Sequence, residues 1–455
     1  MSAINQYTDL YRQFGRRIDA ASSPVLNALR QAALAALDGK RLPAKGDENY
    51  EVSDLEALYA PDYGLNIDRL DVAADTDEPF RCDVPNLSTS LYYIFNDMYH
   101  GSGFTSGTLP EGVMVSSLRN ADEAASKIIG KYYGSIAPID DPQVALNTLL
   151  AQDGILVYVP ARTVVEKPIQ LVNLLRAAGP LMTNRRILVV VEAGAQAKML
   201  VCDHTQTADV DFLNTQVVEI YVGEDATFDY YDLEEASGHT HRVSSLWARQ
   251  EAGSNLLING ITLMNGTTRN DYHIDINGER AETQLLGMAI GSGSQHIDNH
   301  TYIGHNVGYC HSNELFKYVL DDDAVGAFTG KILVAPGSPR TEAYQSNRNI
   351  CASDRARMHT KPQLEIYTDD VKCGHGATVG QLDEEAMFYM QTRGISCHEA
   401  RTLLMQAFMS DVIDGVRLEA LRDRLRHLVE KRFAGTLAQC RSCTAAQACH
   451  AKIKK

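Results

Sequence analysis

Between residues 155 and 375 the chain alternates between apolar and polar positions in short runs. Typical runs are "ILVYV" (155–159), "ILVVV" (187–191) and "QVVEIYV" (216–222), all rich in β-branched residues. A period of two with such residues predicts short β-strands. No stretch of ten residues with a helical period separates these runs. Doubly wound α/β folds and TIM barrels need helices between their parallel strands, so both are disfavoured.

A weak repeat marks the turns between the predicted strands. Acidic residues or glycine precede a small residue at six places: "EAGA" (192–195), "GEDA" (223–226), "EAGS" (251–254), "GERA" (278–281), "DDDA" (321–324) and "SDRA" (353–356). Consecutive starts lie about 30 residues apart, with one wider gap, which is typical of stacked repeats. Each unit is too short to bury its own apolar face, so the coils must stack. The pattern favours a β-solenoid, with a large β-sandwich as the alternative.

Helical patterns flank this core. Residues 1–150 read as mostly helical, with helices expected over 23–37 and 140–154, and further helices begin at residue 383. Two apolar stripes follow: Ala400, Leu403, Leu404, Ala407 and Phe408, then Leu418, Leu421, Leu425, Leu428 and Val429. Periodicity alone favours packing within the chain over a docking surface for these stripes. We expect a helical domain over 1–150, a β core over 151–380 and a C-terminal helical domain over 381–455.

Charge and cysteine content narrow the functional classes. The formal net charge is 42 − 58 = −16, which disfavours binding to nucleic acids or to anionic membranes. The start "MSAINQYTDLYRQF" has no apolar signal region, and the strongest apolar run is too short to span a bilayer, so we expect a cytoplasmic protein. Nine cysteines, an odd number, indicate thiols or metal ligands rather than a disulfide framework.

The stretch "GAFTGK" (326–331) resembles a phosphate-binding loop but does not match one. Only three residues separate its glycines, and Ile332 follows the lysine where Ser or Thr is needed. We therefore expect no ATP hydrolysis by this chain.

Two further sets of residues could carry chemistry. The stretch 295–311 contains His296, His300, His305, Cys310 and His311, and imidazoles on one strand face can bind zinc, iron or copper. Asp369 with Asp370, or the run from Asp321 to Asp323, would supply the carboxylates of a solenoid carbohydrate-active enzyme. Neighbouring strand residues point to opposite faces, so neither acidic group converges simply. A polar row and acidic turns are the favoured interpretations.

The end of the chain reads "CRSCTAAQACH", with Cys440, Cys443, Cys449 and His450. Four thiolate or imidazole ligands within so short a span suffice for one tetrahedral zinc or for an iron–sulfur cluster. These four residues are a candidate metal site.

The segment "DDVKCGHGAT" (369–378) places Cys373 and His375 two positions apart, on one side of a predicted strand. They could be ligands for iron or an iron–sulfur cluster, or a nucleophile with its base. A buried thiol beside a satisfied histidine is a third interpretation, which the chemistry alone slightly favours.

Long motifs add a resemblance to a known family. "FTGKILVAPGSPRTEAYQSNRNI" (328–350), "HTKPQLEIYTDDVKCGHGATVGQLDEEAMFYMQTRGI" (359–395), "EARTLLMQAFMSDVI" (399–413) and, more weakly, "LPAKGDENYEVSDLEALY" (42–59) resemble the SufB/SufD scaffolds of iron–sulfur cluster assembly. The likeness is to SufD, since SufB proteins carry a carboxylate on either side of the histidine where this chain has glycine.

The resemblance implies a right-handed parallel β-helix with helical ends, and a non-enzymatic scaffold subunit. It implies pairing with a SufB-like subunit, docking of a SufC-like ABC-type ATPase on the C-terminal helices, and a transient cluster at the subunit interface. His375 matches the SufD histidine implicated in cluster formation, and Cys373 matches its neighbouring cysteine. Cys351 lies near the place of an essential SufB cysteine, where SufD proteins usually have an aliphatic residue.

The resemblance reverses the interpretation of residues 383–430, in favour of docking. The segment Cys440–His450 is not part of the family pattern, so zinc or iron there would be an additional feature of this chain. Two alternatives stay open at this point: a solenoid carbohydrate-active enzyme, and a SufB-type or homodimeric scaffold.

Overall fold

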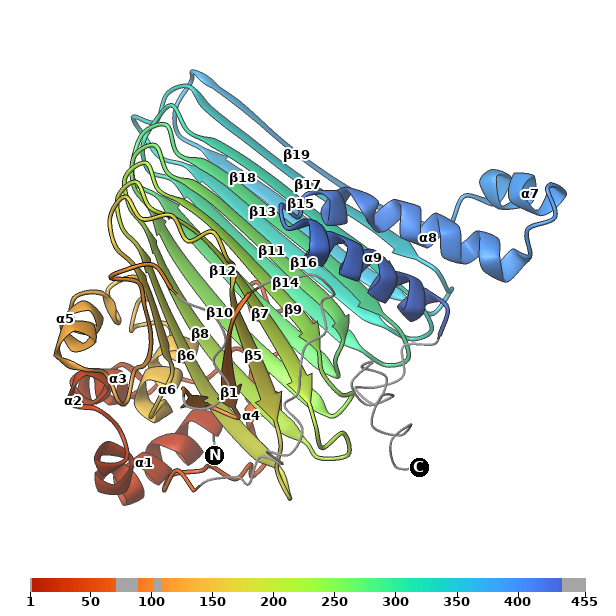
Figure 1. The fold of residues 1–455 in the computed structure, drawn as a ribbon. Helices are drawn as coiled ribbons and strands as arrows, with labels where there is room; N and C mark the ends of the chain where they lie inside the picture. The colour runs from red at the N-terminus through yellow and green to blue at the C-terminus, as the bar shows by residue number, and fades with distance from the viewer. Residues whose placement is uncertain (1, 71–88, 102–108, 436–455) are drawn as a thin grey trace, which may run out of the picture.

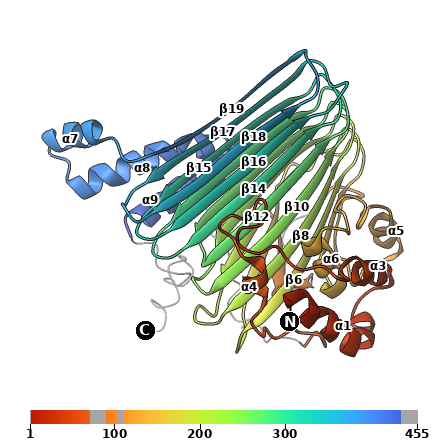
Figure 2. The ribbon, with the colours of Figure 1, turned by 180° about the vertical axis from the view of Figure 1, so that it is seen from behind.

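The computed structural model describes residues 2–70, 89–101 and 109–435. From residue 155 to residue 380 the chain forms a parallel β-solenoid, in which sixteen strands make eight coils of two strands each (Figures 1 and 2). The predicted solenoid is confirmed. The alternative of a large β-sandwich is wrong, because the strands stack in successive coils and every pairing among these sixteen strands is parallel.

Two sheets form the walls of the solenoid. Sheet I has the order β3 (Met114–Ser117), β4 (Ile155–Val159), β6 (Leu181–Val191), β8 (Phe212–Val222), β10 (Thr240–Gln250), β12 (Thr267–Ile276), β14 (His296–His305), β16 (Val325–Val334) and β18 (Arg357–Ile366). Sheet II has the order β2 (Met98–His100), β1 (Ser90–Phe95), β5 (Ile169–Leu175), β7 (Gln196–Thr205), β9 (Thr227–Glu235), β11 (Asn255–Met264), β13 (Glu282–Gly291), β15 (His311–Leu320), β17 (Thr341–Cys351) and β19 (Val371–Gly380). The strands β1, β2 and β3 lie within the region that the sequence pattern described as mostly helical.

The turns explain the weak repeat and correct it. At the turns from sheet I to sheet II the third residue has a positive φ and the next, small residue is fully buried, as in Asp225 followed by Ala226. Only the first four of the six repeats lie in this row, while "DDDA" and "SDRA" lie at the opposite edge. The row continues instead through Cys310 and Thr341, which are fully buried and follow the positive-φ residues Tyr309 and Arg340. These two turns were not recognised from the sequence, because the buried residue in them is not alanine or serine. The wider gap in the repeat falls where the first of them lies.

The interior of the solenoid is apolar along one half and polar along the other. The apolar half includes Val189, Val201 and Ile258, which belong to one continuous core. Further along the same strands the inward positions are polar, and Arg185 donates two hydrogen bonds to the carboxylate of Asp203, at 2.5 and 2.8 Å. Burial opposes ionisation of Asp203, but the Arg185 guanidinium outweighs it and lowers the pKa to about 2. The lumen therefore holds charged side chains that pair with each other.

Six helices cover the start of sheet I: α1 (Ala3–Ala20), α2 (Pro24–Asn27), α3 (Arg30–Ala36), α4 (Leu55–Tyr59), α5 (Glu123–Tyr132) and α6 (Pro142–Leu150). The single helix predicted over 23–37 is in fact two helices, because the helical conformation is interrupted between α2 and α3. The helix predicted over 140–154 is present, with Asp141 as its cap, but it ends at Leu150.

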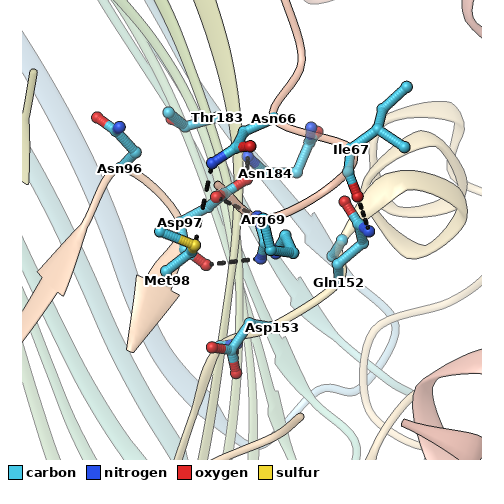
Figure 3. A network of polar contacts seen from close by, with 12 residues as sticks. Asn66, Ile67, Arg69, Asn96, Asp97, Met98, Gln152, Asp153, Thr183 and Asn184 are labelled. Atoms are coloured by element: carbon cyan, nitrogen blue, oxygen red, sulfur yellow. Dashed lines mark hydrogen bonds and ion pairs between the residues drawn. The ribbon is translucent and has the colours of Figure 1, made fainter. Parts of the chain in front are cut away.

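A polar network closes the first coils of the solenoid (Figure 3). Strand β1 extends sheet II beyond β5, and β2 folds back antiparallel on β1. Between them, buried Asp97 pairs with Arg69 and accepts a hydrogen bond from the backbone N–H of Asn184 at 3.2 Å. The carboxylate of Asp153 accepts from the backbone N–H of Tyr99 at 3.0 Å. This end of the solenoid is therefore covered by the protein's own chain.

Three helices lie at the C-terminal side: α7 (Glu384–Thr392), α8 (Cys397–Asp414) and α9 (Glu419–Phe433). The stripe from Leu418 to Val429 is buried in a core shared with the outer face of sheet II. On α8 the predicted stripe is correct in part, because Ala400 is buried and Phe408 packs against this core, but Leu403 is exposed. Most of the buried side is made by Met405, Met409 and Val412. Ser396 caps α8, accepting from the N–H of Glu399 at 3.2 Å.

No helix in the described part of the chain is long and apolar enough to cross a membrane.

Candidate functional site at the open end of the solenoid

The last coil differs from the first. Strands β18 and β19 are the final strands of their sheets, and among the described residues nothing pairs with their outer edges. Most residues of β19 from His375 to Gly380 are exposed, whereas the strands of the middle coils are largely buried. In Figures 1 and 2 this coil lies at the end of the solenoid opposite the N-terminal helices. We call strands β18 and β19 the open end.

Cys373 and His375 both lie on β19, and the register fixes the side to which they point. Cys373 is paired with Ala343 and His375 with Gln345, and both partners on β17 are buried. Residues paired across parallel strands share a side of the sheet, so Cys373 and His375 face the lumen. Cys373 is half-buried and His375 is exposed, because no further coil covers them. The shared side predicted from the strand period agrees with this register.

Burial raises the pKa of the Cys373 thiol, and a hydrogen bond with the Ala343 backbone only partly offsets this effect. A protonated thiol is a poor nucleophile until a metal or a base removes its proton. Nothing in the described surroundings of Cys373 therefore activates the thiol as a nucleophile.

The two glycines beside His375 leave open space. A Cβ at Gly376 would meet no atom within 4 Å, and one at Gly374 would touch the Tyr344 ring at an ordinary 3.6 Å. The folded chain therefore does not demand glycine at either position.

The ligand set at the open end is incomplete. Among the described residues there is no group of three or more His, Cys, Asp or Glu side chains that could hold a metal ion. A thiol and an imidazole supply two ligands, while a tetrahedral iron or zinc centre needs four. The last two coils also carry exposed apolar side chains: Tyr344, Ile366, Tyr367 and Val379. We refer to Cys373 and His375 as the candidate half-site, because they would supply two of the four ligands of such a centre.

The histidine-rich stretch does not form a second site. His300 lies 3.2 Å from Asp271, and exposed His311 lies 3.7 Å from Glu342. His296 contacts the Ser53 hydroxyl at 3.2 Å, and its pKa is lowered by burial. His305 is fully buried against Ser312, and burial lowers its pKa to about 4. Cys310 occupies its place in the turn row described above, so these five side chains serve different parts of the fold.

The acidic candidates also remain apart. Asp321 contacts Arg401 at 3.1 Å and Asp323 contacts Arg355 at 2.7 Å, in the turn between β15 and β16. Asp369 and Asp370 lie in the turn between β18 and β19, at the opposite edge of the solenoid. The favoured interpretation as acidic turns agrees with these positions, and no pair is placed for glycoside hydrolysis.

Cys351 ends β17 and lies far from His375. It stands six positions beyond Gln345, the partner of His375, which corresponds to roughly 20 Å along a strand. It lines a pocket of about 350 Å³ that also includes Leu382, Met387 and Arg401. The structure therefore does not unite Cys351 with the Cys373–His375 pair.

Cys440, Cys443, Cys449 and His450 lie outside the described residues, as does Cys82. The five cysteines that the structure describes are free thiols.

Sequence reasoning missed two lumen residues beneath the open end, Glu314 and Gln345. With His375 they form one lateral row across β15, β17 and β19. The signal was present in their spacing, since 345 − 314 = 31 and 375 − 345 = 30 match the length of a coil. Recognising it requires the exact strand register, which a repeat of about 30 residues does not supply.

Comparisons with known proteins show which family the chain matches. Residues 174–408 match the family described as "SUF system FeS cluster assembly, SufBD core domain", and residues 1–171 match the "SufBD protein N-terminal region". An iron–sulfur cluster assembly SufBD family protein of Synechocystis sp. is 31% identical over 424 residues, covering 91% of this chain and 93% of the relative.

Two proteins named SufD are also similar. Iron–sulfur cluster assembly protein SufD of Escherichia coli is 35% identical over 167 residues, which cover 37% of this chain and 40% of the relative. SufD of Bacillus subtilis is 24% identical over 355 residues, which cover 77% and 80% of the two chains. The chain therefore belongs to the SufB/SufD family of iron–sulfur cluster assembly proteins, with similarity to its SufD members.

Proposed function

We propose that this chain is the SufD-type scaffold subunit of a SufBCD-type complex, and that its open end pairs with a SufB-like subunit to assemble an iron–sulfur cluster between them. The observation that carries the proposal is the half-site on an uncovered edge. Cys373 and His375 face an open lumen, and no third metal ligand of the described chain joins them. A partner strand would complete both the sheet and the ligand set.

The surroundings of the half-site suit such a partner. Lys372 is engaged by Glu342 at 2.7 Å and Lys331 by Glu365 at 2.7 Å, so these lysines do not add uncompensated charge to the edge. The exposed apolar side chains Tyr344, Tyr367 and Val379 offer area for burial on association. The cluster is cargo of this site, held for transfer rather than for catalysis by this chain.

The C-terminal helices supply a second candidate surface, for a SufC-like ATPase. Phe388 and Tyr389 on α7 are 69% and 59% exposed, and Leu403 on α8 is exposed as well. Figure 1 shows α7 standing away from the solenoid, so that its apolar side chains can be reached. Since "GAFTGK" forms part of β16 and lacks the spacing of a phosphate loop, ATP hydrolysis is assigned to the partner.

The ligand role is tested by replacing His375 in the complex. We expect His375→Ala to lower the cluster content of purified complexes at least about tenfold, as loss of a metal-site residue commonly does. Iron and sulfide analysis together with visible absorption measure the content. The control His398→Ala removes an exposed histidine on α8 and should leave it unchanged. Equal cluster content in both variants, with all subunits still associated, would refute the ligand role.

We further propose that Cys440, Cys443, Cys449 and His450 bind zinc or iron independently of the open end. Their ligand types and spacing support this. Metal analysis of the isolated chain should show one bound ion, lost in a Cys440→Ser, Cys443→Ser double variant and retained in Cys373→Ser. Retention of the ion in the double variant would contradict the assignment.

A further inference from the structure

A row of three polar side chains runs from the lumen to the open end. Glu314 on β15 is paired with Gln345 on β17, and Gln345 is paired with His375 on β19. In parallel strands such partners share a side and lie about 4.8 Å apart. His375 therefore stands one strand spacing beyond Gln345, on the same side of sheet II.

Glu314 anchors the amide of Gln345. The Glu314 side chain is fully buried and accepts hydrogen bonds from the Thr301 hydroxyl at 2.6 Å and from Nε2 of Gln345 at 2.8 Å. An ionised carboxylate can only accept, so the amide must turn its nitrogen toward Glu314 and its oxygen away. Burial raises the pKa of Glu314 to about 7, so the carboxylate is mostly ionised at pH 8.

The opposite wall of the lumen, sheet I, leaves room for the Gln345 amide. Gly330 on β16 faces Gln345 so closely that a Cβ there would lie 2.3 Å from Nε2. The position of the amide therefore depends on the absence of a side chain at Gly330, across the lumen.

The amide oxygen has no partner. Gln345 is 2% exposed, and its Oε1 accepts no hydrogen bond from any described residue. A buried acceptor without a donor is costly, and such an atom at a site edge indicates a donor that the structure can bring to it. The next residue in the row, His375, carries a ring N–H that can fill this role.

We propose that Gln345 and Glu314 are positioning residues for His375. Gln345 Oε1 accepts one imidazole N–H, and Glu314 holds the amide so that its oxygen, not its nitrogen, faces the ring. The second ring nitrogen is then unprotonated and directed to the open end, as a metal ligand requires. Only this last step, the use of the nitrogen by a metal, rests on the proposed function.

The test is the tautomer of His375 in the isolated full-length chain. The chain is labelled with ¹⁵N-histidine and studied at pH 8 by long-range ¹H–¹⁵N correlation, and the His375→Ala spectrum assigns the resonance. We expect one ring nitrogen with a bound proton and one without, in a single tautomer. The exposed His398 should instead exchange between the two tautomers. The same exchange at His375 in the unsubstituted chain would overturn the proposal, whatever the variants show.

Three variants separate positioning from general packing. Gln345→Leu removes the acceptor and should leave His375 exchanging like His398. Glu314→Met removes the anchor two strands away from His375 and should have the same effect. Gln216→Leu is the matched control, because Gln216 is also buried and also has a partnerless Oε1, but on β8, five coils from the open end. An unchanged His375 tautomer in Gln345→Leu, or an equal loss in the control, would overturn the proposal.

The cluster assay keeps this proposal distinct from the ligand role. If His375 holds one tautomer but His375→Ala leaves cluster content unchanged, the positioning stands and the ligand role falls. If His375→Ala abolishes the cluster while the tautomer exchanges freely, the ligand role stands and the positioning falls.

Discussion

At the scale of single residues, the open end combines what the strand period can predict with what only register can show. The period of two is enough to put Cys373 and His375 on one side of a strand. It does not reveal that this side faces the lumen, nor that Gln345 lies beneath His375. The distance between Cys351 and His375 could not be judged from the sequence either. It depends on the strand register, which leaves Cys351 at the end of β17, six positions beyond Gln345.

The glycines beside His375 give a prediction about stability. Gly376→Glu should change the free energy of unfolding by no more than about 0.5 kcal/mol, since a Cβ there meets no atom within 4 Å. Gly260→Glu is the contrasting variant, because a Cβ at that position would lie 2.1 Å from the Tyr272 hydroxyl. Chemical denaturation measures both. A large loss of stability in Gly376→Glu would show that the open end is more tightly packed than the structure has it.

Glu314 gives a prediction about pH. Burial raises its pKa to about 7 in the folded chain, against 4.5 for an ordinary glutamate. The carboxyl group therefore stays protonated to a higher pH in the folded state than in the unfolded state. The stability it contributes is complete below pH 4.5 and is lost as the pH rises through 7. Unfolding free energies of the unsubstituted chain and of Glu314→Gln should therefore diverge between pH 5 and pH 8, by on the order of 3 kcal/mol in favour of the variant. A difference that does not depend on pH would contradict the burial assigned to this carboxyl group.

At the scale of elements, the apolar stripes of the C-terminal helices illustrate why periodicity alone is insufficient. The stripe on α9 packs on sheet II as the period alone favoured, so the docking interpretation that the resemblance gave is wrong for this stripe. On α8 two overlapping stripes are possible, and the methionines Met405 and Met409 turn inward instead of Leu403. The choice depends on the shape of the sheet beneath the helix, which the helix sequence does not contain.

The helices α9 and α7 should differ in their roles: α9 stabilises the fold, whereas α7 is exposed and available for docking. Leu425→Ala on α9 should cost about 2–5 kcal/mol, because this side chain is fully buried. Phe388→Ala on α7 should leave the unfolding free energy nearly unchanged but weaken co-purification of the SufC-like ATPase. Denaturation and quantitative pull-down measure the two effects. Undiminished capture of the ATPase by Phe388→Ala would exclude Phe388 from the docking surface.

The turn row shows a similar limit at the level of the repeat. Alanine and serine after an acidic turn were recognisable, but the same buried place is taken by Cys310 and Thr341 in later coils. The solenoid fold follows from the short strands and the period of about 30 residues. The number of coils and the edge to which each turn belongs follow only from the pairing of the strands.

At the scale of the whole molecule, the two ends of the solenoid differ in whether the protein's own chain covers them. One end is covered by β1, β2 and the buried Arg69–Asp97 pair, whereas the other presents strand edges and exposed apolar side chains. Repeat proteins need polar caps at ends that stay in water, so an uncapped end is a place for a partner.

This asymmetry predicts where association is sensitive to charge. Val379→Asp, at a side chain 49% exposed on the open end, should weaken pairing with the SufB-like subunit by about 10-fold or more, since it places a charge in an apolar interface. Val164→Asp is the matched control, because Val164 is 51% exposed between β4 and β5, near the covered end. Equal affinities of the two variants in a titration would count against docking at the open end.

The most direct test of the central claim is amide hydrogen exchange of residues 357–380, in the isolated chain and in its complex with the SufB-like subunit. We predict rapid exchange on the outer edges of β18 and β19 in the isolated chain, and strong protection of both strands on pairing. Protection confined to other segments, with unchanged exchange across 357–380 in a fully formed complex, would contradict it.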